Sequence, residues 1–291
     1  MHRWQILGSG AIGTLVAHLL THAGYSPTLI RKPGAPGISR IKPFSGAETE
    51  VEFSYDNLDS SEPIDQLLVC TKAQHAVAAV KSVSHRLNAN ALVILLHNGM
   101  GPQQDIARQF PQWDVLWGSV THGAYIDPGS QNLVHAGQGE IFVGRPAINR
   151  RDEQLALPSI FTQVRDIEMR LWQKLAINCL INPLTVKYDC LNGELLNIPE
   201  ASLDMARLAA ELENLAQHMG VDLNQTLTLA EKVAEQTANN RSSMLQDVTL
   251  KRPNEIDFIT GFVVQTGERL HLDVGHHQAL WQLVKDKSRV L

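Results

Sequence analysis

The feature that most constrains the fold is a cluster of three glycines near the N-terminus, Gly8-Ser9-Gly10-Ala11-Ile12-Gly13. It follows a strand-like segment at residues 3–8 and opens an apolar helix that runs to about Ala23; a second strand is expected at residues 28–30. Strand, glycine turn, helix and strand in this order are typical of dinucleotide-binding folds. The first glycine makes the tight turn, the second lets the backbone approach a pyrophosphate, and the third lets helix and strand pack closely. The helix N-terminus would offer N–H groups and a positive dipole end to the phosphates.

Two cations, Arg31 and Lys32, stand where an NAD-binding chain usually carries Asp or Glu for the ribose 2′-hydroxyl. An arginine can instead bind a 2′-phosphate through two N–H groups. The alternative interpretation is a pair of exposed loop charges. We expect NADPH/NADP as the cofactor, bound by Gly8, Ser9, Gly10, Ala11, Ile12, Gly13 and Arg31.

The rest of the first half predicts an α/β domain. Strands are expected at residues 49–55, 66–71, 90–96, 115–122 and around 133–144, helices at 74–87 and 152–164, and a loop with at most one short strand at 33–46. The continuous apolar runs at 66–71 and 90–96 indicate buried parallel strands. Lys72 and Asn98 follow them, at the strand ends where such sheets bind ligands. Asn98 is therefore a candidate cofactor or substrate contact; the alternative is a turn-forming Asn-Gly pair.

Beyond about Val164 the strand patterns stop, and helical patterns cover residues 168–182, 201–219, 224–239 and 253–270. The sequence thus predicts an α/β protein with an N-terminal Rossmann-like domain, residues 1–164, and an all-α C-terminal domain, residues 165–291. The active site is expected in the cleft between them.

One helix of the second half, residues 171–182, is apolar over most of its circumference and is expected to end at Pro183. Lys174, Asn178 and Asn182 nevertheless recur every four residues and form one polar stripe. A lysine inside an apolar helix needs a partner, a ligand or water, and the asparagines need hydrogen-bond partners too. The stripe would suit a small polar anion; the alternative is a solvated edge of a half-buried helix.

Composition excludes several classes of protein. The 291 residues carry a formal net charge of −5, which gives no reason to expect nucleic acid or an anionic membrane as a partner. No apolar run is long enough to span a membrane, and the N-terminus shows no secretion signal. Three cysteines fit buried thiols in a reducing compartment better than a disulfide framework. We therefore expect a cytoplasmic protein, either a monomer or a homodimer.

The histidines do not predict a metal site. His18 and His22 have the i, i+4 spacing of a metal-binding pair, but no glutamate follows His18 and no third ligand is apparent. We interpret them as surface residues of the first helix. His276 and His277 are likewise expected to be an exposed pair at a helix end.

Taken together, the motifs resemble those of one family, the ketopantoate reductases (2-dehydropantoate 2-reductases), over nearly the whole chain. The resemblance rests on the glycine motif and on segments of matching order and spacing. These are Cys70–Ala73, His97–Gly101, Lys174–Thr185, Asn192–Leu195, Ser242–Asp247 and Glu255–Gly261.

The resemblance implies an NADPH-dependent reductase that converts ketopantoate to pantoate in pantothenate and coenzyme A biosynthesis. It implies Lys174 as the catalytic general acid and Glu255 as an active-site carboxylate near the nicotinamide ribose. Further implied cofactor contacts are Arg31, Lys72, Asn98 and Ala124. The implied substrate contacts are Asn98, Lys174, Asn178, Asn182, Asn192 and Ser243.

Two rival functions remain at this point. The nearer is a reductase of the same architecture that acts on another 2-keto acid. The other is a non-catalytic NADP-sensing module, which would keep the glycines and Arg31 but would not need Lys174 and Glu255 together.

Overall fold

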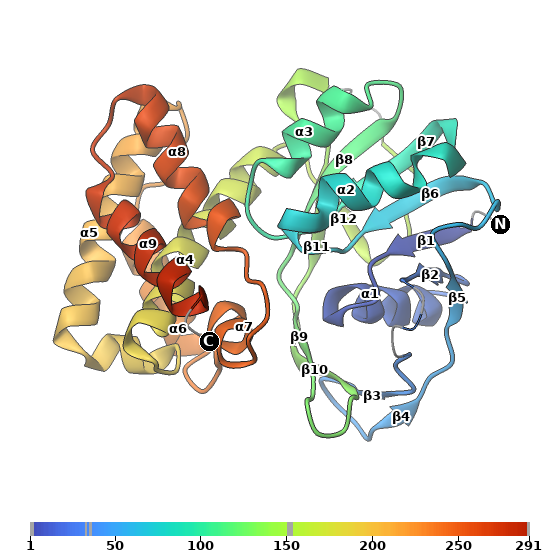
Figure 1. Ribbon diagram of the computed structural model, residues 1–291, viewed down its shortest axis with the longest axis horizontal. Coiled ribbons are helices and arrows are strands. Elements are labelled where there is room, and N and C mark those ends of the chain that lie inside the picture. Colours follow the sequence, from blue (N-terminus) through green and yellow to red (C-terminus); the bar gives the residue numbers. More distant parts are fainter. Residues whose placement is uncertain (1–2, 33, 35–36, 150–153, 290–291) are drawn as a thin grey trace. The chain divides into compact units, whose positions relative to one another are not determined.

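The structure is a computed structural model that describes residues 3–32, 34, 37–149 and 154–289 (Figure 1). The chain forms two compact units, one of Met1–His97 with Pro102–Glu168 and one of Asn98–Gly101 with Met169–Leu291. The domain division after residue 164 that we predicted from the sequence stays a proposal. Helix α4 (Ile167–Tyr188) carries the chain from the first unit into the second.

The first unit contains a large sheet of the expected Rossmann-like kind. Its antiparallel pair is β11 with β8, and its other pairs are parallel. The apolar runs predicted as buried strands form β6 and β7, next to β1 at the centre. In order across the sheet the strands are β12 (Phe161–Gln163), β11 (Ile141–Gly144), β8 (Asp114–Val120), β7 (Leu87–Leu95), β6 (Ile64–Val69), β1 (Trp4–Leu7), β2 (Thr28–Ile30) and β5 (Ser54–Asp56).

A second, four-stranded sheet and short helices complete this unit. Helix α1 (Ala11–His22) shares a buried core with both sheets, because its residues Leu15 and Leu20 cluster with Ile6 of β1 and Leu133 of β10. In Figure 1, α2 and α3 lie on the other side of the large sheet from α1. The remaining elements are β4 (Thr49–Glu50), β3 (Arg40–Lys42), β10 (Leu133–Gly137), β9 (Gly123–Ile126), α2 (Ala73–Val83), η1 (Ser84–Arg86), α3 (Pro102–Gln109) and η2 (Ala147–Asn149).

Two expectations for this unit were wrong, and a third was correct in type but incomplete. The strand predicted at 49–55 is two short strands, β4 in the small sheet and β5 at the edge of the large one. The segment around 133–144 is in strands, as predicted, but it forms two of them, β10 in the small sheet and β11 in the large one, each with an antiparallel neighbour. The described part of the helix predicted at 152–164 is not helical: Phe161–Gln163 form β12, which pairs with β11. In each case the strand partners that the fold provides, and not the local pattern alone, decide where the strands begin and end.

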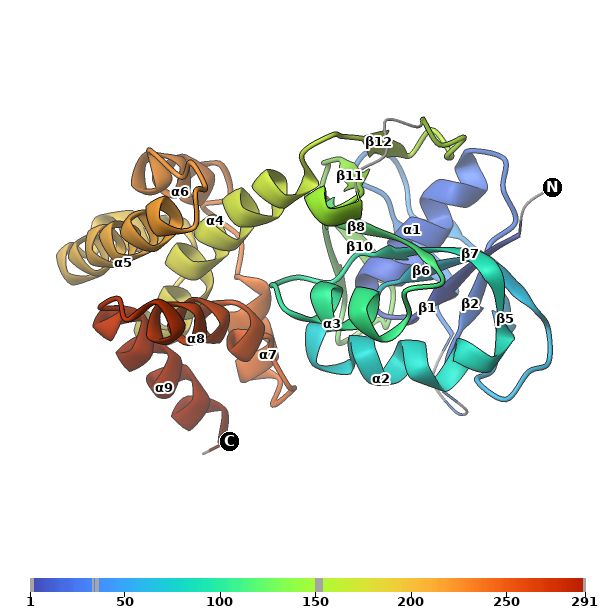
Figure 2. The same cartoon turned by 90° about the horizontal axis from the view of Figure 1, so that it is seen from above.

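The second unit is all-α, as predicted. Helices α5 and α9 pack on α4 around Leu184, α7 contacts it at Thr185, and the ring of Phe262 in α8 lies 5.7 Å from that of Trp172. Figure 2 shows α4 with the other helices on its sides. Their bounds are α5 (Pro199–His218), α6 (Thr226–Gln236), α7 (Ser243–Thr249), α8 (Thr260–Leu270) and α9 (Gly275–Arg289), with the short turns η3 (Gly193–Asn197) and η4 (Ile256–Phe258).

Helix α4 departs from expectation at one point, because Pro183 does not end it. The helix continues to Tyr188 with the proline inside. A proline has no N–H, so the carbonyl of Cys179, four residues earlier, loses its helical partner. Burial on nearly all sides stabilises the helix despite this loss.

The histidines also differ in part from prediction. His276 is exposed at the start of α9, but His277 is fully buried, and both ring Nδ1 atoms lie within hydrogen-bond distance of the Glu211 carboxylate. His18 is half-buried, with its ring 4.3 Å from that of His22.

Among the described residues, no group of three acidic, histidine or cysteine side chains could hold a metal ion. No helix in the described ranges combines the length and apolarity needed to cross a membrane.

Candidate active site

In the glycine turn between β1 and α1, the protein's own packing requires glycine at two of the three positions, Gly8 and Gly13. Gly8 has φ +110°, in a region that favours glycine, and a Cβ there would touch the backbone of Cys70 and Thr71 at 3.0 Å. A Cβ on Gly13 would overlap with the carbonyl oxygen of Gly8. A Cβ on Gly10 would meet no described atom within 4 Å, so protein packing does not require this glycine. Close approach of a phosphate would require it.

Arg31 follows directly after β2, at the carboxyl edge of the large sheet. Its guanidinium carbon lies 3.9 Å from the centre of the Tyr55 ring, and its backbone N–H donates to the Asp56 carbonyl at 3.1 Å. Stacking on an aromatic ring uses the face of a guanidinium and leaves its edge for hydrogen bonds. The Tyr55 ring therefore fixes the plane of the Arg31 guanidinium.

The other predicted cofactor contacts of this unit lie after a strand, in the case of Lys72, and within a strand, in the case of Ala124. Lys72 is half-buried and directly precedes α2, three residues after the last residue of β6. Ala124 lies in β9, where it pairs with His135 of β10. Pairing in the small sheet fixes the main chain at Ala124, and a backbone contact is what the resemblance implies for this residue.

Within the helical unit the structure brings three predicted residues into direct contact. The Lys174 Nζ atom donates to Asn98 Oδ1 at 2.7 Å, and Asn98 Nδ2 donates to Glu255 Oε2 at 2.9 Å. An ammonium can only donate and a carboxylate can only accept, so this contact pattern fixes the orientation of the amide. Asn98 thus links an ammonium and a carboxylate that are 81 residues apart in the sequence.

The environment of Lys174 changes its acidity. The side chain is half-buried, and burial lowers the pKa of its ammonium to about 8. The Glu255 carboxylate, itself 9% exposed, acts in the opposite direction and favours the charged form. A lysine with a pKa near neutral pH gives up a proton more readily than an ordinary surface lysine.

The turn that carries Asn98 is held tightly by the segment that carries Glu255. The Met100 N–H donates to the Phe258 carbonyl at 2.9 Å. Gly99 has φ +74°, and a Cβ there would overlap with the same Phe258 carbonyl. Both backbone contacts fix the Asn98 amide relative to Glu255, which is the preorganisation that a proton-transfer site needs.

The remaining members of the polar stripe lie farther along α4. Asn178 is half-buried and Asn182 is 9% exposed. Thr185, which is fully buried, donates to the Asn182 carbonyl at 2.7 Å and lies 2.6 Å from the Ser242 hydroxyl. Ser242 is the N-cap of α7, and the exposed Ser243 is the first residue of that helix.

Asn192 lies in the turn after α4 and is 8% exposed. Its Nδ2 donates to Thr237 Oγ1 at 2.9 Å, and its N–H donates to the Asn240 carbonyl at 3.0 Å. Its Oδ1 is buried without a hydrogen-bond partner among the described residues. The loop between α6 and α7 thus contacts Asn192 and, through Ser242, helix α4, so both ends of this loop meet predicted substrate residues.

The sequence did not single out Thr185, Ser242 or Thr237. All three are hydroxyl residues that contact a predicted site residue or its backbone. Thr185 and Ser242 fall inside motif segments, but their roles depend on which residues the fold brings near them. The sequence signal that could have indicated a role for Thr185 and Ser242 is their closeness in the chain to Asn182 and Ser243.

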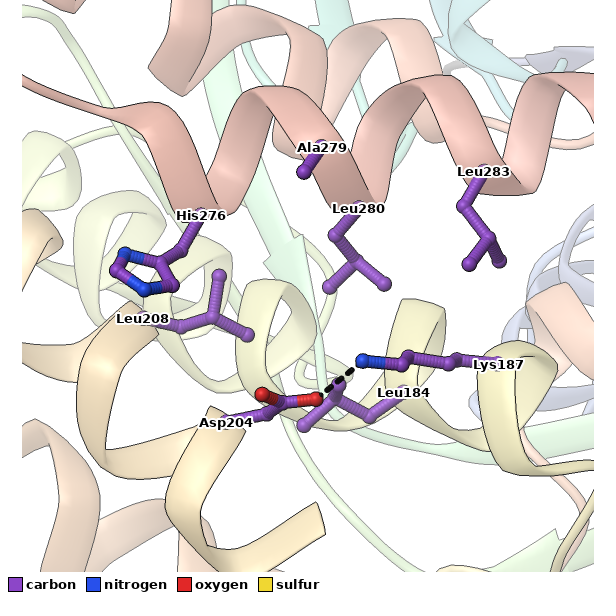
Figure 3. A pocket seen from close by; sticks show the side chains of 8 residues that line it. All are labelled: Leu184, Lys187, Asp204, Leu208, His276, Ala279, Leu280 and Leu283. Atoms are coloured by element: carbon purple, nitrogen blue, oxygen red, sulfur yellow. Dashed lines mark hydrogen bonds and ion pairs between the residues drawn. The ribbon is translucent and has the colours of Figure 1, made fainter. Parts of the chain in front are cut away.

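The helical unit also has a small cavity of about 120 Å³ that none of the predicted site residues lines (Figure 3). Apolar side chains of α4, α5 and α9 form most of it, and the Lys187 ammonium donates to Asp204 at 2.5 Å on its wall. Each charged group of this ion pair already has a partner, and the rest of the lining is mostly apolar. The network around Lys174 is therefore the better candidate for a catalytic site.

Comparisons with known proteins agree with this arrangement. The family model described as ketopantoate reductase PanE/ApbA matches residues 4–147, and the model described as ketopantoate reductase PanE/ApbA C terminal matches residues 166–288. A curated relative, the 2-dehydropantoate 2-reductase of Vibrio cholerae serotype O1, is 33% identical over 291 residues, which cover 96% of this chain and 96% of the relative.

Two solved structures are similar over almost the whole chain. A PanE/ApbA family ketopantoate reductase from Ralstonia eutropha has a TM-score of 0.85 at 25% identity, covering 99% of this chain and 98% of that one. A D-mandelate dehydrogenase, solved with NADH and anilino(oxo)acetate, has a TM-score of 0.88 at 21% identity, covering 99% of each chain. The second similarity shows the fold alone.

Proposed function

Because the chain belongs to the ketopantoate reductase family, we propose that it reduces ketopantoate (2-dehydropantoate) to pantoate with NADPH, in pantothenate and coenzyme A biosynthesis. The observation that supports this proposal most is the contact of Lys174 with Glu255 through Asn98. A protein that only binds a dinucleotide has no use for a lysine of lowered pKa joined to a buried carboxylate. The proposed domains are residues 1–164 for the cofactor and 165–291 for the substrate.

The residues of the first unit fit a dinucleotide. The turn Gly8–Gly13, with the open position at Gly10, would hold the pyrophosphate at the N-terminus of α1. Arg31 would meet the 2′-phosphate, and Lys72 and Ala124 would complete the contacts. When bound, the nicotinamide supplies the hydride that a 2-keto carbon accepts.

In the proposed reaction Lys174 is the general acid. Negative charge develops on the carbonyl oxygen as the keto carbon is reduced, and the ammonium stabilises this charge and gives the oxygen a proton. Asn98 keeps the ammonium in place, and Glu255 favours its charged form before the reaction. Asn98 and Glu255 are also proposed contacts of the cofactor, so one network would align cofactor, acid and substrate.

The substrate offers a carboxylate, a carbonyl and a hydroxyl to this site. Asn178, Asn182, Asn192 and Ser243 are the proposed contacts for its polar groups. Amides and hydroxyls can bind both a carboxylate and a hydroxyl without excess charge. A keto acid without the hydroxyl would leave a buried amide unpaired and would be rejected for that reason.

The proposal is tested by following NADPH oxidation with ketopantoate and with a panel of simpler 2-keto acids. Trimethylpyruvate is the sharpest comparison, because it differs from ketopantoate only in having hydrogen in place of the hydroxyl. Preference for ketopantoate supports the proposal. Preference for another keto acid supports the rival reductase, and cofactor binding without any turnover supports the sensing module.

The pH dependence of the reaction is expected to follow the titration of Lys174, and Glu255 is expected to shift it. A general acid must be protonated, so kcat should be high below a pKa of about 8 and fall as the pH rises through it. In Glu255→Gln the carboxylate no longer favours the ammonium, so the fall should move to lower pH. The measurement is a kcat profile on both sides of pH 8, with the exposed carboxylate variant Glu200→Gln as a control. An unchanged profile in Glu255→Gln would argue against coupling to Lys174.

Recognition of the substrate hydroxyl is expected to depend on Asn182. In Asn182→Ala, kcat/KM should fall about tenfold more for ketopantoate than for trimethylpyruvate, the factor expected for one lost hydrogen bond. The exposed Asn214→Ala on α5 serves as the matched control. Equal losses for both keto acids would make Asn182 a structural support of α4 instead.

The proposed partner is a small-molecule 2-keto acid, with no nucleic acid or membrane. The cytoplasm is the proposed location, because three sparse cysteines suit a reducing compartment. Sedimentation equilibrium would distinguish a monomer from a homodimer.

A further inference from the structure

Thr185 joins two elements that carry proposed substrate contacts. It is fully buried on α4, and its Oγ1 lies 2.7 Å from the Asn182 carbonyl oxygen and 2.6 Å from Ser242 Oγ. Ser242, 5% exposed, also accepts the Leu245 N–H at 3.0 Å and so caps α7. A continuous hydrogen-bonded path therefore runs from the start of α7 to the backbone of Asn182.

The hydrogens along this path can be assigned. Thr185 has a single hydroxyl hydrogen, and a carbonyl can only accept, so that hydrogen points to the Asn182 carbonyl. The Ser242 hydroxyl must then donate to Thr185 Oγ1 while it accepts from Leu245. Each hydroxyl both donates and accepts, so the buried pair is fully satisfied and has one orientation.

Helix α4 needs such a fixed point at this position. Pro183 directly follows Asn182 and removes one helical hydrogen bond, which leaves this turn less constrained by the helix itself. A threonine hydroxyl that bonds to a carbonyl of the preceding turn also bends a helix locally. The backbone at Asn182 is therefore held by Thr185 and Ser242 as well as by the helix.

We propose that Thr185 is a positioning residue that holds Asn182 and the start of α7, with Ser243, in one geometry and thereby sets the preference for a substrate that carries a hydroxyl. This inference rests on the proposed function and on Asn182 and Ser243 as substrate contacts. Thr185 acts through these residues and does not itself touch the substrate.

The test compares Thr185→Val, which keeps the shape but removes the hydroxyl, with Thr185→Ser, which keeps the hydroxyl. In the full-length enzyme, kcat/KM for ketopantoate relative to trimethylpyruvate should fall about tenfold in Thr185→Val, the factor for one misplaced hydrogen bond. Thr185→Ser should retain the wild-type ratio, and the KM for NADPH should be unchanged in both. Thermal unfolding is measured in parallel, and Ser242→Ala replaces Thr185→Val if the latter does not fold.

A double-mutant cycle separates positioning from simple stability. If Thr185 acts through Asn182, Thr185→Val should change the ratio less than about twofold in an Asn182→Ala background, because coupled residues are not additive. A lowered Tm with an unchanged ratio, or equal effects in both backgrounds, overturns the inference. Lack of turnover of ketopantoate by the wild-type enzyme would instead overturn the proposed function, and this inference with it.

Discussion

Replacing Lys174 by alanine is expected to lower kcat at least about 100-fold, the low end of the effect of a lost general acid. The ammonium is the group in the network with Asn98 and Glu255 that can both donate a proton and stabilise an oxyanion. Its pKa of about 8 means that it is largely protonated at neutral pH and still acidic enough to react. NADPH affinity should stay nearly intact, because the phosphates are expected to bind in the other unit.

The measurement is kcat with saturating ketopantoate, together with the Kd of NADPH and the Tm of each variant. Lys187→Ala is the matched control, since Lys187 lies on the same helix and pairs with Asp204 instead of Asn98. It should keep kcat within a few-fold of wild type. A similarly small change in Lys174→Ala would rule out Lys174 as the acid.

The elements that periodicity predicts well are those stabilised by their own pattern. The glycine turn, the apolar strands β6 and β7 and the apolar part of α4 were all expected from the sequence. The expected helix at 152–164 was wrong because β12 exists only through its pairing with β11, which no local pattern encodes. Pro183 was misread for a similar reason, since packing around α4 outweighs the loss of one helical bond.

In the candidate site, too, local spacing predicted some residues, while contacts between distant parts of the chain could not be predicted. Spacing alone placed Lys174, Asn178 and Asn182 on one face of a helix, but the sequence could not show that Asn98 lies between Lys174 and Glu255. That contact depends on the backbone of Gly99 and Met100 against Phe258, which is long-range in sequence. Thr185 was missed because its importance comes from Ser242, 57 residues later.

The choice between NADPH and NADH is expected to depend on Arg31 and not on the fold. The fold alone does not select between the two dinucleotides, because they differ at the ribose 2′ position and the residue that meets this position decides. Arg31 and Lys32 stand where an acidic residue would favour NADH, and the Tyr55 ring holds the Arg31 guanidinium by one face. A charge-assisted pair with a 2′-phosphate would use the guanidinium edge.

In Arg31→Ala the KM for NADPH is therefore expected to rise between about tenfold and about 100-fold, the range for lost hydrogen bonds to a charged group. The KM for NADH should change little, because NADH has no phosphate at that position. Arg31→Lys should give an intermediate loss, since it keeps the charge but loses the planar fork and the stacking on Tyr55. The exposed Lys81→Ala in the same unit removes one positive charge elsewhere and should leave both KM values unchanged. Equal losses for NADPH and NADH in Arg31→Ala would mean that the arginine supports the fold around β2, and the preference for NADPH would need another origin.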